Sequence, residues 1–504
     1  MRMKKPGLLL LFLLLVPALL ALAAWAAGRQ PGFSRSRWLE EQMAWGARMP
    51  ENLVPEDPRR LKAFLDRLAR TKPSRGGIPK GVVRVSGDIL APGGGPAQPE
   101  TETEPFFAID PENPKHLLAS YQEDRFEDGG CRSLTSAVSF NGGLTWQESL
   151  LPRLTLANGG PYQRTSDPWV AFGTGGRAYF ASLGFDETTA QNGVYLSSSD
   201  DGGRTWSDPV AVHSGTTTFD DKEAVVVDNR DDSPYKGRVY VGWDSINASR
   251  QQPELIAYSD DGGRSFQPPA TLTLQGSNLG IIPLVGPGGI VHAVWLSYQA
   301  QQVLLLASHS MDGGQTWSAP VTVSDLRAFG VEGSRTGAGL PAAAVDGRTG
   351  AVYVAWEDGR FTASTDQIVL SRSTDGGQTW SAPQRVSDGP GDAPNFTPAV
   401  AVTPEGWVGV SYYSLRSNPS HVLVDEYLAV SKNGGEKFTN SRLTASSWDL
   451  RFAAAADGFF LGDYQGLAAA SKTFYPLWIG TFSVSRLDPP ARQPDAYTRA
   501  VKVK

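Results

Sequence analysis

The stretch SSDDGGRTW, Ser198–Trp206, decides the fold, because variants of it recur along the chain. Its skeleton is S-x-D-x-G-x-T-W. The other copies are VSFNGGLTW (138–146), YSDDGGRSF (258–266), HSMDGGQTW (309–317), RSTDGGQTW (372–380) and VSKNGGEKF (430–438). We call each of these six copies a box. The serines of successive boxes are 51 to 63 residues apart. A period of this size predicts an architecture of similar units placed side by side.

Each unit reads as four strands joined by turns. In the fifth unit these are LPAAAVD, AVYVAWEDGR, QIVLSRSTDGG and TWSAPQRVS, in that order. Sequential strands with short connections predict an antiparallel meander, and meanders repeated around an axis form a β-propeller. The fold class is therefore predicted as all-β, a β-propeller of four-stranded antiparallel blades.

The number of blades follows from a large residue in the second strand of each unit. It recurs as Tyr121, Leu183, Trp243, Trp295, Trp356, Tyr412 and Trp478. Seven blades are thus favoured, although only six carry a box. The segment KGVVRVSGD (80–88) resembles the fourth strand APQRVSDG (382–389), so we expect residues 82–86 to close the ring. Closure would remove exposed sheet edges. The alternative is six blades, with the last segment packed outside the ring.

The box residues have the chemistry of a turn. The carboxylate or amide can accept hydrogen bonds from its own turn, the glycines permit positive φ, and the terminal aromatic ring can wedge between sheets. The residues in the Asp position are Asn141, Asp201, Asp261, Asp312, Asp375 and Asn433. One carboxylate per loop falls short of the ~6 oxygens that calcium prefers. The boxes are therefore predicted to be structural.

The N-terminus has the pattern of an export segment. A basic start, MRMKK, precedes an apolar run that ends in small residues, AWA at 24–26. Residues 1–28 are predicted to be a signal peptide or a membrane anchor, since the run is near the ~20 residues that span a bilayer. Residues 29–79 read as a short N-terminal helical spacer, and residues 80–504 as the propeller. A secreted or otherwise extracytoplasmic location follows, and cleavage of the segment is left open.

Composition limits the partners. The net charge of −6 gives no reason to expect nucleic acid. Cys131 is the single cysteine and the five histidines lack ligand spacing, so neither a disulfide within the chain nor a metal or other cofactor is expected. A monomer is expected.

The boxes resemble the Asp boxes, or BNR repeats, of the sialidase superfamily. The longer phrases RTSDPWVAF, VYVAWEDGR and FFLGDYQGLAA resemble exported bacterial sialidase-like proteins, over about residues 100 to 485. The resemblance implies a propeller and a glycan or other polar cell-surface ligand.

Strands alternate in direction along a meander, and the boxes join the third strand to the fourth. The inner strands therefore begin, and the second strands end, on the face opposite the boxes, and we expect the ligand mouth on that face. Acids and arginines gather there in the sequence. The candidate catalytic residues are Asp167, Glu104, Asp124, Asp358, Asp463 and Tyr413. The candidate substrate-binding residues are Arg125, Arg360, Arg416, Glu357 and Lys222. Arginines can clamp an anion bidentately, and paired acids can act as general acid and base.

The superfamily pattern has three arginines that grip a carboxylate, a Tyr nucleophile assisted by a Glu, and an Asp acid/base. This sequence departs from it. Glu104 stands near the place of the first arginine, Ser414 replaces an Asp usual in the bacterial set, and the last blade reads WIGTF instead of ending Trp-x-Asp-x-Arg. The negative charge of Glu104 would repel a sialic acid carboxylate, and the two departures from the bacterial set thin the charged rim on one side.

Two functions remain open. One is an exo-sialidase-like glycoside hydrolase that acts on glycans at the mouth. The other is a non-catalytic propeller scaffold that binds a cell-envelope polysaccharide or protein. A hydrolase needs two carboxylates that face each other within ~5–10 Å, whereas a scaffold can pair each acid with a neighbouring arginine.

Overall fold

The computed structural model describes residue 70 and residues 77–504 without 94, 248, 250, 274–275, 300–301, 337–338, 390, 392, 418–421 and 483–492. The predicted export segment and most of the predicted spacer therefore lie outside the described residues. From residue 77 onward the described chain contains strands and 3-10 turns but no α-helix. Within the described residues, no helix is long and apolar enough to cross a membrane. The 3-10 turns are η1 (Leu156–Asn158), η2 (Thr174–Gly176), η3 (Pro287–Gly289) and η4 (Leu450–Phe452).

The strands pair as antiparallel four-stranded sheets, which we call blades. Blade 1 contains β2 (Glu102–Ile109), β3 (Leu117–Arg125), β4 (Cys131–Ser139) and β5 (Gln147–Leu150). Blade 2 contains β6 (Arg164–Phe172), β7 (Ala178–Phe185), β8 (Asn192–Ser199) and β9 (Val210–Gly215). Blade 3 contains β10 (Thr218–Val227), β11 (Val239–Asn247), β12 (Glu254–Ser259) and β13 (Ala270–Thr273). Blade 4 contains β14 (Ser277–Val285), β15 (Val291–Gln299), β16 (Gln302–Ser310) and β17 (Val321–Leu326).

The second half of the chain supplies three more blades. Blade 5 contains β19 (Ala342–Val345), β20 (Val352–Asp358), β21 (Gln367–Ser373) and β22 (Gln384–Arg385). Blade 6 contains β23 (Asn395–Val402), β24 (Val408–Ser414), β25 (Leu423–Ser431) and β26 (Thr439–Arg442), and β27 (Trp448–Asp449) also pairs with β25. Blade 7 contains β30 (Gly466–Ala470), β31 (Thr473–Gly480) and β32 (Asp495–Thr498), with β33 (Val501–Lys502) beside β31 and β1 (Val83–Arg84) beside β32.

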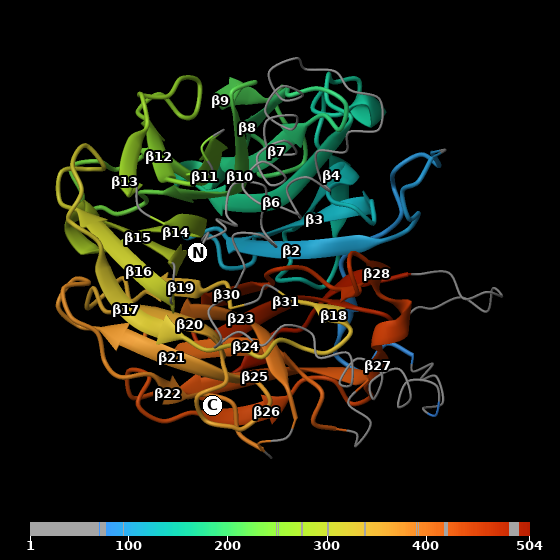
Figure 1. The fold of residues 1–504 in the computed structure, drawn as a ribbon, viewed down its shortest axis with the longest axis vertical. Coiled ribbons are helices and arrows are strands. Elements are labelled where there is room, and N and C mark those ends of the chain that lie inside the picture. Colours follow the sequence, from blue (N-terminus) through green and yellow to red (C-terminus); the bar gives the residue numbers. More distant parts are fainter. Residues whose placement is uncertain are drawn as a thin grey trace, which may run out of the picture.

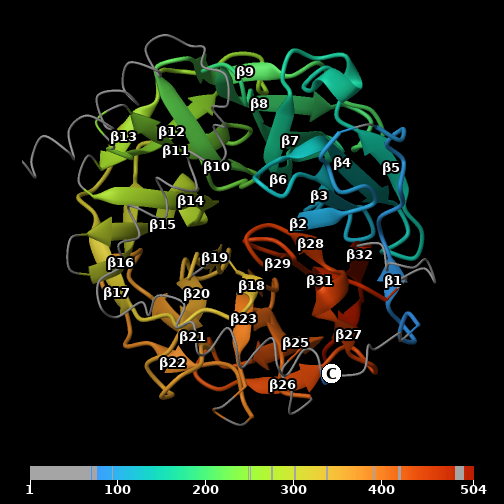
Figure 2. The same ribbon diagram turned by 45° about the vertical axis from the view of Figure 1, so that its right-hand side comes forward.

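The blades stand around a common centre, and the two ends of the described chain meet in blade 7 (Figures 1 and 2). β1 is antiparallel to β32, with Val83 opposite Thr498 and Arg84 opposite Tyr497. Arg84 also forms an ion pair with Asp495. The blades take up all of the described strands except β18 (Ser334–Arg335), β28 (Ala454–Ala455) and β29 (Phe459–Phe460), which form a separate three-stranded sheet, and blade 7 takes its outer strand from the N-terminal side.

The core lies inside the blades and between neighbouring ones. The second-strand residues recognised in the sequence, from Tyr121 to Trp478, are all at most 1% exposed. Each aromatic ring of this size buries 150–250 Å², so these residues account for a large share of the hydrophobic stabilisation.

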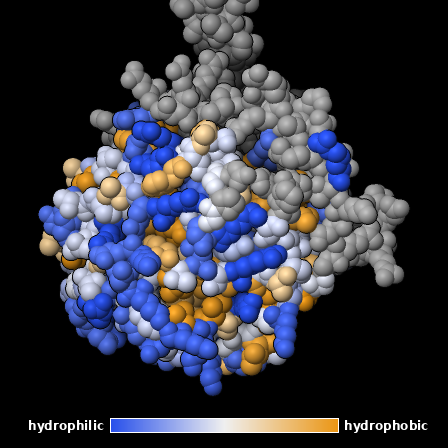
Figure 3. Space-filling model, turned by 90° about the horizontal axis from the view of Figure 1, so that it is seen from below, coloured by the Kyte–Doolittle hydropathy of each residue, from blue (hydrophilic) through white to orange (hydrophobic). Residues whose placement is uncertain are grey.

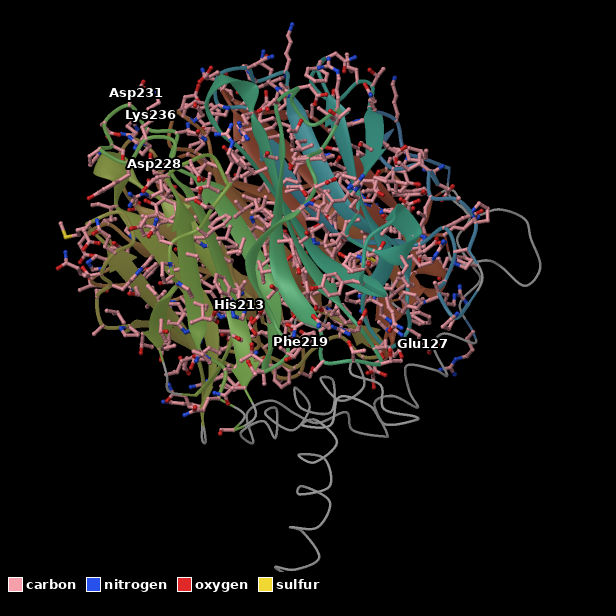
Figure 4. All side chains as sticks on the ribbon, turned by 90° about the horizontal axis from the view of Figure 1, so that it is seen from above. Glu127, His213, Phe219, Asp228, Asp231 and Lys236 are labelled. Atoms are coloured by element: carbon pink, nitrogen blue, oxygen red, sulfur yellow. The ribbon has the colours of Figure 1, made fainter. Side chains whose placement is uncertain are left out.

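The register separates two faces of the ring. In blade 1, Ser139 of the first box lies opposite Leu117, whereas Glu102 at the start of the inner strand lies opposite Glu123 at the other end of the sheet. We call these ends the box face and the mouth face. Figure 4 labels residues at both ends of the sheets, with Phe219 of blade 3 and His213 of blade 2 at one end and Asp228, Asp231 and Lys236 at the other.

The boxes fold as self-contained turns. In the second box, the Ser199 hydroxyl donates to Asp201 Oδ1 at 2.7 Å and accepts from the Gly203 amide at 2.8 Å. Asp201 Oδ1 also accepts from the Thr205 amide at 2.9 Å. Gly203 has φ 94°, and a Cβ there would lie 2.9 Å from Leu118 of the preceding blade. The box carboxylate is thus consumed by its own turn.

Candidate functional site

The inner strands of five blades share a bulge at the mouth face. The pairing register shifts at this point in β2, β6, β10, β14 and β23. The bulge residue has positive φ in every case: Glu104 (52°), Asp167 (54°), Lys222 (50°), Gly280 (76°) and Thr397 (48°). A non-glycine residue in this conformation costs about 1–3 kcal/mol, and such strain concentrates at functional sites. The bulges place Glu104, Asp167 and Lys222 at one level of the ring.

Lys222 is the centre of this level. Its Nζ lies 2.7 Å from Asp167 Oδ1, 2.8 Å from Asp463 Oδ2 and 3.4 Å from Glu104 Oε1. The lysine therefore joins blade 3 to blades 2, 1 and 7 across the centre. All four side chains are buried, with at most 9% of any of them exposed. Two acids on one Nζ can be no further apart than about 6 Å, which is below the ~6.5–9.5 Å of inverting glycosidases.

A small sheet of the mouth face brings a second cation to the same acids. β18 (Ser334–Arg335) runs parallel to β29 (Phe459–Phe460), which pairs with β28 (Ala454–Ala455). These strands belong to the links between blades 4 and 5 and between blades 6 and 7, and they lie over the centre of the ring in Figure 2. Arg335 of β18 lies 3.1 Å from Asp463. The links therefore hold Arg335 against the Lys222 cluster.

Arg125 completes the cationic side of the site. The Phe460 ring has the guanidinium of Arg125 at 4.7 Å and that of Arg335 at 4.9 Å. Arg125 also donates to Gln122 at 3.0 Å, and Gln122 in turn donates to Glu104. Burial and the nearby Arg335 lower the pKa of Arg125. One aromatic ring thus holds two guanidinium groups beside the acids.

A small pocket of about 60 Å³ opens at these groups. The charged side chains that line it are Glu104, Arg125, Asp128, Asp167, Asp221, Lys222 and Arg335. Phe185 and Phe219 supply an apolar wall. Such a mixture of convergent polar groups and aromatic rings is typical of ligand sites.

A larger cavity of about 270 Å³ lies further along the inner strands, towards the box face. Its walls are largely apolar, with residues such as Val225, Ile282 and Val400, and Trp169 stacks on Phe106 with ring centroids 3.5 Å apart. Asp463 and Tyr464 form its polar side. The ionic cluster therefore separates a polar pocket from an apolar channel.

The acids of the cluster differ in their protonation. Burial, partly offset by Lys222, raises the pKa of Glu104 to about 7. Burial acts on Asp463 in the same direction, but Arg335 and Lys222 hold its pKa well below the ordinary value. Burial and the neighbouring Asp167 raise the pKa of Asp221 to about 7. Glu104, with its pKa raised to about 7, and Asp463, with its pKa lowered, thus both contact Lys222.

The remaining predicted residues do not join this cluster. Asp124 pairs with Arg132, and Arg416 pairs with Asp388. Arg360 lies 2.8 Å from Asp358 and 3.3 Å from Asp325. These pairs run sideways along the rim, so Arg360 and Arg416 do not converge with Arg125.

Two further candidate site residues, Tyr413 and Glu357, are buried in the protein. Tyr413 is fully buried in the core between blades 6 and 7, where its oxygen accepts the Ile479 amide at 2.8 Å. Glu357 accepts the Thr397 amide at 2.7 Å, and burial raises its pKa to about 7. Neither residue lines the pocket.

Sequence reasoning missed Arg335, Phe460 and Tyr464. Arg335 lies in the glycine-rich link VEGSRTGAG (331–339). This link has no alternation of apolar and polar residues, so the sequence does not predict where Arg335 lies in the fold. Tyr464 follows the predicted Asp463 directly and could have been noted there. Among the described residues, no group of three or more His, Cys, Asp or Glu is arranged to hold a metal ion. At the acid cluster, Lys222 takes the central position.

Comparisons with known proteins agree with the repeat. Residues 293–446 match the model of the BNR repeat-like domain, which spans most of blade 4 and blades 5 and 6. The matched stretch is less than half of the chain. No curated protein matches the chain.

Solved structures resemble the propeller at low identity. A protein of unknown function from Dyadobacter fermentans is 14% identical, with 84% of this chain and 100% of that chain covered and a TM-score of 0.45. The leech intramolecular trans-sialidase is 14% identical, over 72% and 70%, with a TM-score of 0.46. The Fusarium graminearum α-L-arabinofuranosidase is 13% identical, over 67% and 93%, with a TM-score of 0.44.

Proposed function

We propose that this BNR propeller acts on a glycan at the mouth face and that the reaction is glycoside hydrolysis. The observation that carries the proposal is the pair of carboxyls on Lys222 whose pKa values are pushed apart, with Glu104 near 7 and Asp463 well below its ordinary value. Environments that separate two acids in this way assign the roles of proton donor and ionised partner.

Glu104 is the proton donor in this proposal. It lines the pocket, and at neutral pH a substantial fraction of it carries a proton. Asp463, the ionised partner, lies within about 6 Å of Glu104, as their shared contact with Lys222 requires, so a short carboxylate separation favours retention of the anomeric configuration. Arg125 and Arg335 offer a bidentate grip for an acidic group of the sugar.

The test is hydrolysis of a panel of fluorogenic glycosides that includes a sialoside and an arabinofuranoside. Replacing Glu104 with Gln should lower kcat on the best substrate by about 100-fold or more, the usual contribution of general acid catalysis. The matched control is Glu123→Gln, because Glu123 lies in the same blade, also has a pKa near 7 through burial, and accepts the Leu90 amide at 2.7 Å instead of lining the pocket. The control should keep kcat within about three-fold. Absence of turnover on every glycoside, or equal loss in both variants, would overturn the hydrolase proposal.

A non-catalytic scaffold is the second candidate, and the sideways ion pairs of Asp358, Arg360 and Arg416 favour it. In that case the Lys222 cluster ties four blades together without reacting. Titration calorimetry with the same sugars would then give binding without turnover, and Arg125→Gln would weaken it.

We further propose that the chain is exported, on the strength of the basic and apolar residues at 1–28. Cell fractionation with sequencing of the mature N-terminus tests this. A cytoplasmic protein that retains residue 1 would contradict it.

A further inference from the structure

A cavity at the centre of the ring takes no part in the proposed hydrolysis. It has a volume of about 270 Å³ and lies on the box side of the Lys222 cluster. The inner strand of every blade contributes to its wall. One such residue from each blade, in chain order, is Ala108, Phe172, Val227, Leu284, Ala343, Val400 and Leu467. The ring itself therefore encloses the cavity.

Apolar and aromatic side chains stay accessible at this cavity, although they lie at the centre of the protein. The residues that line it and are only half-buried include Phe106, Trp169, Leu284 and Leu340. Trp169 stacks on Phe106 with ring centroids 3.5 Å apart. The centroid of the Tyr464 ring lies 5.5 Å from that of Trp169 and 6.4 Å from that of Phe106. Three aromatic rings thus form one side of the cavity.

The cavity offers no charge that a ligand could use. Among the described residues that line it, Asp463 is the only charged one, and its carboxylate already lies 2.8 Å from Lys222 and 3.1 Å from Arg335. An ionic ligand would lose its hydration without gaining a partner, which makes its burial costly. An apolar molecule has no such loss, and an apolar cavity of about 150 Å³ is enough to bind benzene. Size and lining therefore favour an uncharged ring.

A polar group on the aromatic side of the cavity has no partner. Trp169 Nε1 makes no hydrogen bond to any described residue. The indole nitrogens of Trp243 and Trp478 also lack a partner, but both are sealed in the core, whereas Trp169 is half-buried at the cavity wall. An indole N–H can only donate, so it matches an oxygen acceptor on a molecule in the cavity.

We propose that the central cavity binds a small uncharged aromatic molecule that carries a carbonyl oxygen. The ring packs against Phe106, Trp169 and Tyr464, and the oxygen accepts the Trp169 N–H. The apolar wall excludes a sugar, whose several hydroxyls would be left unpaired there. The site is independent of the proposed hydrolysis, because it lies on the box side of the Lys222 cluster and its occupation needs no turnover.

Fluorine NMR titration with matched probes tests the proposal. The first probe, para-fluoroacetophenone, carries the carbonyl, and the second, para-fluoroethylbenzene, has nearly the same shape without an acceptor. We expect both to bind the full chain saturably. A third probe, para-fluorobenzoate, is ionised at neutral pH and should bind at least about ten-fold more weakly than para-fluoroacetophenone.

The variant Trp169→Phe separates the hydrogen bond from the ring contacts. It keeps an aromatic ring on the wall but removes the N–H. We expect it to weaken the binding of para-fluoroacetophenone about five-fold, near the net value of one hydrogen bond, and that of para-fluoroethylbenzene less than about two-fold. Because the two probes are compared on one protein, a general loss of stability does not change the ratio.

A second pair of variants locates the bound probes. The outer surface seen from below also shows hydrophobic side chains among hydrophilic ones, where an apolar probe could collect (Figure 3). Leu284→Trp fills the cavity and should weaken the binding of both neutral probes at least about ten-fold. The matched control is Leu144→Trp, the same change at a residue that is 71% exposed and lies outside the cavity, and it should change the affinities less than about two-fold.

Each of four results would overturn the proposal. No saturable binding of para-fluoroacetophenone, or equal binding by Leu284→Trp and Leu144→Trp, would leave the cavity without this ligand. Binding of para-fluorobenzoate as tight as that of para-fluoroacetophenone would show an anion site at the cations of the mouth instead. Equal weakening of both neutral probes by Trp169→Phe would remove the carbonyl from the ligand class, and this last result does not depend on whether Leu284→Trp folds.

Discussion

At the scale of single residues, the box carboxylates are structural acids. Asp375 accepts from the Thr379 hydroxyl and the Thr379 amide, and these bonds with that from Ser373 lower its pKa to about 2. It is therefore ionised at any physiological pH and has no proton to donate. This chemistry was predictable from the spacing of Ser, Asp and Thr, because the turn is local.

The first prediction concerns the hydroxyl of the box serine. Ser199 is 1% exposed and links Asp201 to the Gly203 amide, so Ser199→Ala leaves a buried amide without its partner. We expect a loss of about 1–3 kcal/mol in the free energy of unfolding, measured by denaturant titration. Asp200→Ala is the control: Asp200 is 80% exposed in the same box, and its pair with Arg177 should contribute less than about 1 kcal/mol. Equal losses would contradict the structural role of the hydroxyl.

Other features at the scale of single residues could be predicted from the sequence only in part. Glu104, Asp167 and Lys222 were placed at the mouth by strand parity, and they lie together there. Their positive φ was not predictable, because it arises from bulges at non-glycine residues, where no local preference announces it. The sideways pairs of Arg360 and Arg416 depend on neighbours in adjacent loops, which strand patterns do not order.

At the scale of elements, β1 depends on one ion pair as well as on its short ladder. Arg84 pairs with Asp495, which is 4% exposed, and Glu102 is buried nearby. Arg84→Met should destabilise the protein by about 1–3 kcal/mol, because it leaves Asp495 buried without its cation. The loss should be greater at pH 8 than at pH 5, since the pKa of Asp495 is raised to about 6 and the acid is neutral at the lower pH.

The double variant Arg84→Met with Asp495→Asn is the control for this pair. Removing the acid together with its cation should restore part of the stability. Denaturant titrations of the three proteins at both pH values measure the effect. A loss that is independent of pH, or a double variant less stable than the single one, would show that the ion pair does not hold β1.

The elements differ in how far the sequence could place them. The four strands of each blade follow from alternation and the repeated box, and KGVVRVSGD matched a fourth strand by its similarity to residues 382–389. β18 and β29 could not be found in the same way. Each has two residues, and Ser334 and Phe459, 125 positions apart, meet across two irregular links. The position of Arg335, which belongs to β18, could therefore not be predicted either.

At the scale of the whole molecule, buried acids should make the protein more stable in mild acid than in mild base. Burial raises several carboxyl pKa values: Glu104, Glu123, Glu357 and Asp221 to about 7, and Asp495 to about 6. Between the unfolded values near 4 and these folded values, the folded protein binds more protons than the unfolded chain, so stability falls as pH rises. His292, with its pKa lowered to about 4 by burial, acts in the opposite direction but is a single group.

The melting temperature should therefore be higher at pH 5 than at pH 8. Each raised carboxyl contributes a slope of at most about 1.4 kcal/mol per pH unit within its window. Glu357→Gln removes one such group while its amide oxygen can still accept the Thr397 amide, so the gap between the two melting temperatures should narrow. Asp375→Asn, whose wild-type pKa near 2 lies below the window, should leave the gap unchanged even if both melting temperatures fall. Thermal scans of the three proteins decide the matter, because a wild-type protein that melts higher at pH 8 would mean that the buried carboxyls are ionised in the folded ring.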